Sequence, residues 1–390
     1  MKNKAENSFE GVDNYTKKKM VIASMTLMTV FMLILSGCKK SDDLIVADNQ
    51  DQTANAELRT SHGVTYLVSD EASYHPSFVD PNLVNAWGMS FTPSGQVWVN
   101  STEKGVATIY DMEGDVMMRP IIIPFGDAGG RAHPTGSVTS PEGARFAIRG
   151  ADQLSKMIFS TEEGTIAAWG SGAMATIVAD RSNVHAVYKG LAVANNDGRW
   201  MLYATDFHNR RIDVFNEKFE LVASRGFDDP RIPDTFSPFG IRGFGSKLIV
   251  TYAMRDEKGE DDVAGPGNGY VDLYRADGML LRGFAEGGSL NSPWGIEMYT
   301  PARTPAAQTE LSPDIERRIV LIGNFGDGHI NIFDQTGNCI GQLQGHEGPI
   351  TIDGLWSISY KPGHFGEATR LYFTAGPADE AHGLFGFISN

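Results

Sequence analysis

Cysteine is nearly absent from this sequence, because its 390 residues include only Cys38 and Cys339. Two cysteines cannot build a disulfide-rich scaffold or a four-cysteine metal cluster. Positive charge is also scarce: 33 lysines and arginines stand against 48 aspartates and glutamates, and the formal net charge is −15. Such a surface repels phosphate backbones, so we expect no binding to nucleic acid.

A hydrophobic run long enough to span a membrane is missing as well. The uninterrupted run without charge at residues 20–35 is short for a membrane span and has the length of a signal-peptide core. Three lysines precede it (Lys17, Lys18 and Lys19), and the small residues Ser36 and Gly37 precede Cys38. This order resembles a bacterial lipoprotein signal. We therefore expect a signal peptide over residues 1–37 and lipidation of Cys38, with an uncleaved anchor helix as the alternative.

Residues 38–62 are polar and have the composition of a disordered tether. A domain over residues 64–390 follows. This organisation predicts a protein of the bacterial cell envelope, on the periplasmic side or at the cell surface, that touches the membrane through its lipid anchor alone.

Glycine is abundant, at 44 residues, and it opens most copies of a short repeat. The copies read GVATIYD (from 105), GTIAAWG (164), RRIDVFN (210), GYVDLYR (269), GHINIFD (328) and GLFGFIS (383). Apolar residues alternate with a period of two, which is typical of a half-buried strand. Regular copies of this kind indicate a repeat architecture.

A second repeated element precedes each of these strands. It reads AWGM (86–89), PTGS (134–137), YKGL (188–191), PFGI (238–241), PWGI (293–296) and LWSI (355–358). Between the two elements we expect a further strand, at 97–99, 145–148, 201–204, 248–250, 319–322 and 371–373. Several units end in a fourth short strand, and no amphipathic helix separates the units.

Six such units predict an all-β fold, a six-bladed β-propeller with four antiparallel strands per blade. The last unit ends after its third strand, and residues 64–68 form an orphan strand before the first unit. We expect this N-terminal strand to complete the last blade and close the ring. A β-sandwich and a β-helix are the alternatives, but six copies are too many for one sandwich and a spacing near 50 residues is irregular for a β-helix.

Several long motifs resemble an uncharacterised family of exported bacterial propeller proteins. They are DPNLVNAWG (80–88), DDVAGPG (261–267), GNFGDG (323–328) and TAGP (374–377) followed by HGLFG (382–386). The resemblance covers roughly residues 64–388 and implies the propeller fold and export, but no activity. The ring is more distantly similar to NHL-repeat-like propellers, which include lyases, lactonases and binding modules.

Propeller geometry assigns the loops to two faces. The loops between the second and third strands (B–C loops) share one face with the connections between blades (D–A connections), and the A–B and C–D turns share the other. The first face, here called the loop-rich face, has more chemically active residues. We expect the following residues there: His133, Arg149, Lys189, Asp206, His208, Arg255, Asp256, Asp327, Asp353, Glu380 and His382. A ligand is expected at the central entrance, where the loops converge.

A divalent metal is one hypothesis for this face. Asp206 with His208, and Asp261 with Asp262 in the acidic loop 255–269, offer oxygen and nitrogen ligands suited to calcium or another divalent ion. No local spacing dictates a site, so these residues can equally be solvated loop residues. The aromatic residues that precede the first strand of each unit (Trp87, Tyr188, Phe239, Trp294 and Trp356) could stack on a sugar, or pack between adjacent blades.

Two functions remain. The first is a binding or scaffold module that presents the loop-rich face to a protein, a glycan or a small ligand. The second is a metal-assisted lyase or hydrolase with its site at the channel mouth. The sequence has no nucleophile-elbow motif in a strand–turn–helix setting, which favours the binding module.

Overall fold

The computed structural model describes residues 58, 61–126, 130–148, 150, 153–222, 226–299, 319–361 and 370–389. The expected signal peptide (1–37), Cys38 and most of the tether (38–62) lie outside these described residues. Strands form nearly all of the regular structure, with short 3₁₀ turns at Ala72–Tyr74 and Ser182–Val184. Within the described residues, no helix is long and apolar enough to cross a membrane.

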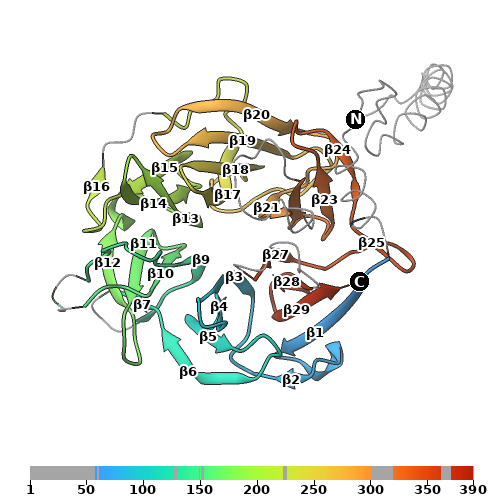
Figure 1. Cartoon of the computed structure of the whole chain (residues 1–390), viewed down its shortest axis with the longest axis horizontal. Helices are drawn as coiled ribbons and strands as arrows, with labels where there is room; N and C mark the ends of the chain where they lie inside the picture. Colours follow the sequence, from blue (N-terminus) through green and yellow to red (C-terminus); the bar gives the residue numbers. More distant parts are fainter. Residues whose placement is uncertain are drawn as a thin grey trace, which may run out of the picture. The chain divides into compact units, whose positions relative to one another are not determined.

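Six antiparallel sheets form a ring, and the first strand of each sheet lies nearest the centre (Figure 1). Blade 1 contains β3 (Ala86–Phe91), β4 (Val97–Ser101), β5 (Val106–Tyr110) and β6 (Val116–Ile122). Blade 2 contains β9 (Pro134–Thr139), β10 (Met157–Thr161), β11 (Thr165–Trp169) and β12 (Thr176–Asp180). Blade 3 contains β13 (Tyr188–Asn196), β14 (Arg199–Asp206), β15 (Arg211–Phe215) and β16 (Leu221–Val222).

Blade 4 contains β17 (Phe236–Phe244), β18 (Lys247–Met254), β19 (Gly269–Arg275) and β20 (Leu280–Glu286). Blade 5 contains β21 (Pro293–Tyr299), β22 (Ile319–Asn324), β23 (Ile330–Phe333) and β24 (Cys339–Gln342). Short pairs join blades: β7 (Pro124–Phe125) with β8 (Gly130–Arg131), and β25 (Gln344–Gly345) with β26 (Gly348–Pro349). The six-bladed β-propeller predicted from the repeats is therefore confirmed.

Blade 6 closes the ring with strands from both ends of the domain. It contains β27 (Leu355–Tyr360), β28 (Arg370–Ala375), β29 (Leu384–Ser389) and then β1 (Gly63–Ser69), with the short β2 (Phe78–Val79) beside it. β1 runs antiparallel to β29, and Gly63 pairs with Ser389 at one end of the ladder. The orphan strand expected at 64–68 thus holds the predicted place. Its residues Leu67 and Val68 are buried.

The glycine of each inner strand allows neighbouring blades to approach closely. A Cβ atom added to Gly240 would lie 2.2 Å from the carbonyl oxygen of Trp294 in the next blade. Gly88, Gly136, Gly190 and Gly295 meet the next blade in the same way. Blade 6 has Ser357 at this position, and its hydroxyl donates to the carbonyl of Trp87 at 3.0 Å. The repeated glycine is therefore a packing requirement of the ring.

One expected strand is wrong. The second strand of blade 2 is β10 (Met157–Thr161) and not residues 145–148. Phe146 and Ile148 are fully buried, but they pack against Phe219 of blade 3 from the long connection between β9 and β10. Because these two apolar residues are separated by one residue, the segment has the same alternating pattern as a half-buried strand. Arg149 and Asp152, which lie outside the described residues, therefore belong to the A–B connection and not to a B–C loop.

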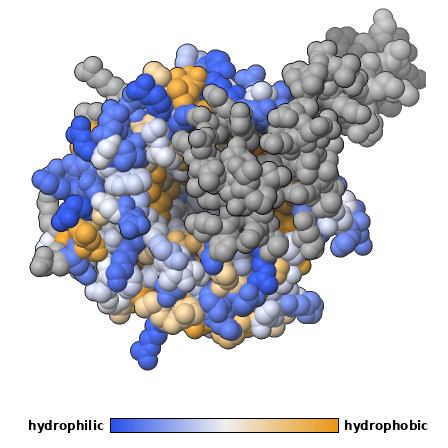
Figure 2. All heavy atoms as spheres, in the orientation of Figure 1, coloured by the Kyte–Doolittle hydropathy of each residue, from blue (hydrophilic) through white to orange (hydrophobic). Residues whose placement is uncertain are grey.

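Hydrophobic clusters fill the spaces between adjacent blades, and each joins residues of at least two blades. Hydrophilic residues predominate on the surface seen in Figure 2, with hydrophobic residues in small groups. On the outer strand β6, three neighbouring hydrophobic side chains are exposed: Val116, Met117 and Met118. The blades thus pack side by side around one axis, and their six inner strands surround a common centre.

Candidate functional site

Aromatic side chains from several blades meet at the axis, at the loop-rich end of the inner strands. Trp87 and Trp356 stack with centroids 3.7 Å apart, and Phe325 stacks on the Trp356 ring at 3.9 Å. Trp294 contacts both tryptophans edge-on, and Phe239 joins the same cluster. We call this set the aromatic plug. Its members come from blades 1, 4, 5 and 6, so they pack on one another around the axis.

The plug buries most of these aromatic residues, although Trp294 remains partly exposed. Trp87 and Trp356 are at most 2% exposed, so their faces are not open to a sugar. Tyr188 behaves differently: it packs between blades, and its hydroxyl donates to Asp213 at 2.8 Å. The residue that occupies the plug position in blade 3 is its neighbour Lys189.

Lys189 is a buried ammonium beside this plug. The residue is 2% exposed, and its Nζ lies 5.2 Å from the centre of the Trp87 ring. Nζ donates to Glu162 at 2.5 Å and to Asp261 at 3.3 Å. Burial disfavours the charge, but these two carboxylates outweigh it and raise the pKa of Lys189 above its ordinary value. The lysine is therefore charged and held in place.

Two further acids complete what we call the axial cluster: Lys189, Glu162, Asp261, Asp262 and Glu380. Burial raises the pKa of Glu380 to about 7; Lys189 opposes this rise, and Glu162 and Asp261 add to it. Burial also raises the pKa of Asp262, while the nearby Ser292 hydroxyl and Lys189 lower it. Four carboxyl groups thus surround one ammonium, and the cluster has an excess of negative charge.

The cluster is assembled from separate blades on the loop-rich face. Glu162 comes from the B–C turn of blade 2, Asp261 from the B–C loop of blade 4, and Glu380 from that of blade 6. Ser292, just before the blade 5 inner strand, is fully buried, and its hydroxyl lies beside the Asp262 carboxyl.

Asp206 has a structural role in the B–C turn of blade 3. Its carboxylate is fully buried, accepts from the Val187 amide at 3.2 Å and from Asn209 Nδ2 at 2.8 Å, and pairs with Arg211 at 3.2 Å. Burial raises the pKa of Asp206, while the bonds from Asn209 lower it. The neighbouring His208 accepts a bond from Arg255 through its backbone carbonyl, at 3.1 Å.

Two expected histidines pair with acids that are not members of the axial cluster. His133 Nδ1 lies 2.6 Å from Glu163, whose hydrogen bond raises the pKa of His133 to about 9. His382 Nδ1 lies 3.0 Å from Asp70, in the connection after β1. Sequence analysis did not identify Glu163 or Asp70, because they lie 30 and 312 residues from the histidines with which they pair.

The remaining expected acids stabilise turns of the same face. Asp353 accepts from the Ala378 amide at 2.9 Å, and Asp256 accepts from the Glu260 amide at 2.9 Å. Asp327 accepts from Asn324 Nδ2 at 3.0 Å and lies 3.3 Å from His329. These bonds give each carboxylate a local partner, as expected for loop residues.

The part of the chain that the structure describes contains no assembled set of metal ligands. No group of three or more His, Cys, Asp or Glu side chains there has an arrangement that could hold a metal ion. Asp206 is occupied by Arg211, and Asp261 is occupied by Lys189. The ammonium of Lys189 thus lies where a cation beside Asp261 would lie.

The comparisons with known proteins place the chain among uncharacterised relatives. No family model matches it. It is 30% identical over 341 residues to uncharacterized protein L690 of Acanthamoeba polyphaga mimivirus, covering 83% of this chain and 85% of L690. The chain belongs to the family of L690. Uncharacterized protein R648 of the same virus is 29% identical over 344 residues, covering 84% of this chain and 80% of R648.

Solved structures similar to this family member share the fold. A gluconolactonase from Xanthomonas campestris, XC5397, has a TM-score of 0.50 at 12% identity, covering 91% of this chain and 99% of the enzyme. Virginiamycin B lyase from Staphylococcus aureus has a TM-score of 0.46 at 13% identity, covering 79% of this chain and 97% of the lyase. At these identities the likeness concerns the propeller alone.

Proposed function

We propose that this protein is a binding module of the bacterial cell envelope, anchored through a lipid on Cys38. Its ligand or partner binds at the axial cluster through a cationic or hydrogen-bond-donating group. The observation that supports this proposal is the convergence of four carboxyl groups and a buried lysine from four blades at the axis. Perturbed pKa values and convergent charges at a central entrance are typical of ligand sites.

The charge balance indicates the ligand class. Lys189 neutralises part of the field of Glu162 and Asp261, but Asp262 and Glu380 add further negative charge. The whole chain has a formal net charge of −15. A cationic group on a protein, an amino sugar or a small amine is attracted to such a site, whereas an anion is repelled.

A charge-neutralising variant tests the site. Asp261→Asn removes one carboxylate whose side chain is 75% exposed, so the fold should tolerate it. We expect the affinity for spermidine, measured by calorimetry at low salt, to fall about tenfold, or about 1.4 kcal/mol. Glu260→Gln, in the same loop, is the matched control and should bind as the wild type does. Equal binding by both variants, or preference for an anionic probe, would contradict the proposal.

A second candidate is a lyase or hydrolase at the same entrance, with or without a divalent metal. The pKa of about 7 for Glu380 favours it, because a general acid or base works best when its pKa is near the operating pH. Metal analysis of the purified, folded domain distinguishes a metal-assisted enzyme from a metal-independent one. A folded protein without bound metal would argue against the metal-assisted enzyme. An enzyme of this kind should lose activity in Glu380→Gln while keeping its fold.

The anchor is tested separately. Cys38→Ser removes the thiol that lipidation requires. We expect the wild type to partition into the detergent phase and the variant to partition into the aqueous phase. A variant that remains in detergent would show that residues 20–35 act as an uncleaved anchor instead.

A further inference from the structure

A cavity lies at the centre of the ring, between the inner strands and beside the aromatic plug. Its volume is about 320 Å³, and residues of all six inner strands line it. They come from the middle of each inner strand and from its end towards the A–B connection, where Ser90, Ser137, Val193 and Ser359 lie. Trp294 belongs both to the plug and to the cavity lining. The cavity is therefore distinct from the axial cluster on the loop-rich face.

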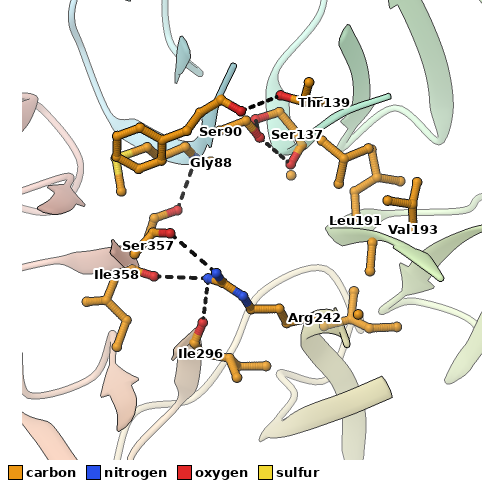
Figure 3. A pocket seen from close by; sticks show the side chains of 18 of the residues that line it. Gly88, Ser90, Ser137, Thr139, Leu191, Val193, Arg242, Ile296, Ser357 and Ile358 are labelled. Atoms are coloured by element: carbon orange, nitrogen blue, oxygen red, sulfur yellow. Dashed lines mark hydrogen bonds between the residues drawn. The ribbon is translucent and has the colours of Figure 1, made fainter. Parts of the chain in front are cut away.

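One wall of the cavity, from blades 1 and 2, presents hydroxyl groups that already donate hydrogen bonds within the protein (Figure 3). Ser90 donates to the carbonyl of Ser137 at 2.9 Å, and the two hydroxyls lie 3.1 Å apart. Thr139 donates to the carbonyl of Phe91 at 2.9 Å. Their remaining lone pairs make this wall an array of acceptors.

The opposite wall presents the guanidinium of Arg242, as Figure 3 shows. Arg242 extends from blade 4, and its Nη1 donates to the carbonyl oxygens of Ile296 at 2.9 Å and Ile358 at 3.4 Å. Its Nη2 donates to Ser359 Oγ at 3.4 Å and pairs with Glu297, which is 3% exposed, at 2.9 Å. This wall is polar, but its charge is compensated and its Nη groups already have partners within the protein.

The remaining lining is apolar. Leu191, Val193 and Ile241 form one side, and the partly buried ring of Trp294 lies at the inner end. A ligand here meets acceptors on one side, the charge-compensated guanidinium of Arg242 on the other, and apolar surface between them. The volume is near the lower limit of small-molecule sites, about 300 Å³.

We propose that this cavity binds a neutral polyhydroxylated ring of monosaccharide size. Sugar hydroxyls can donate to the free lone pairs of Ser90, Ser137 and Thr139, while the C–H face of the ring packs on apolar surface. A carboxylate fits less well, since the acceptor wall repels it and Glu297 already compensates Arg242. A fully apolar ligand would leave the lone pairs of this wall without partners.

Saturation-transfer NMR tests the proposal with glucose, galactose and N-acetylglucosamine as neutral probes and glucuronate as the anionic probe. We expect binding of at least one neutral sugar and weaker binding of glucuronate. Val193→Phe fills the lumen and should weaken sugar binding at least tenfold. Val222→Phe makes the same change on the exposed strand β16 and should leave binding unchanged.

Ser90→Ala provides a second variant if Val193→Phe fails to fold. It removes one acceptor without adding volume, and we expect a loss of affinity of about tenfold. The proposal is overturned if no neutral sugar binds, if glucuronate binds more tightly than every neutral sugar, or if Ser90→Ala and Val222→Phe bind equally well. Because Asp261 does not line the cavity, spermidine binding at the loop-rich face reports on the other site independently.

Discussion

At the residue scale, burial decides the chemistry of the axial cluster. Lys189 takes the place that aromatic residues occupy in four other blades, and its charge is retained because Glu162 and Asp261 approach it. Glu380 shares the same surroundings, and its pKa of about 7 follows chiefly from burial. The same residue types in exposed loops would have ordinary pKa values.

Glu380→Gln should therefore change how stability depends on pH. The folded-state pKa of about 7 lies above the ordinary value of 4.5, so the proton-linked contribution to stability is complete below pH 4.5 and is lost as pH rises towards 7. We expect the variant to equal the wild type below pH 4.5. Above pH 7 it should be more stable by up to about 3 kcal/mol.

Urea unfolding between pH 4 and 8 measures this difference. Glu347→Gln is the control, because Glu347 is exposed and its removal should not alter the pH profile. Parallel pH profiles for wild type and Glu380→Gln would contradict the assignment of a raised pKa to Glu380.

At the element scale, the glycine of each inner strand sets the distance between blades. Gly240→Ala places a methyl group 2.2 Å from the Trp294 carbonyl, and backbone must move to accommodate it. Overpacking of this kind costs about 1–3 kcal/mol. We expect a lower melting temperature for Gly240→Ala in a thermal unfolding experiment.

Gly63→Ala is the matched control for this change. Gly63 has open space around its Cβ position and no positive φ, so alanine should be tolerated there. If both variants melt at the wild-type temperature, the inner strands are not packed as closely as the structure indicates.

At the scale of the whole molecule, β1 (Gly63–Ser69) holds the two ends of the ring together. It pairs with β29 along its length and buries Leu67 and Val68. Full burial of each such side chain contributes about 1.5–3 kcal/mol, and its loss would also expose the edge of β29. This is a large part of the 5–15 kcal/mol that stabilises a typical domain.

A truncated protein that lacks residues 38–69 should therefore lose its cooperative unfolding transition. A second truncation that lacks only residues 38–57 retains β1 and should unfold as the longer chain does. Calorimetry distinguishes the two, and a cooperative transition of unchanged temperature in the shorter protein would show that ring closure does not depend on β1.

The sequence alone determined the architecture, because a repeated strand pattern is a local signal and six copies reinforce one another. The alternation in GVATIYD and its copies, the preceding glycine and the orphan strand at 64–68 were enough to predict the ring and its closure. The pattern failed at residues 145–148, where Phe146 and Ile148 alternate for a different reason: they cover blade 3 from a long connection.

The tertiary structure alone decided which loop residues meet. Lys189, Asp261 and Glu380 were candidates from their loops, but nothing in the sequence joined them to Glu162, which lies in an ordinary turn. The cavity beside the plug, with Ser90 and Arg242 on facing walls, likewise could not be predicted from the sequence. Contacts across the axis join residues that are tens to hundreds of positions apart, and the closure of six blades, rather than any local spacing, fixes their distances.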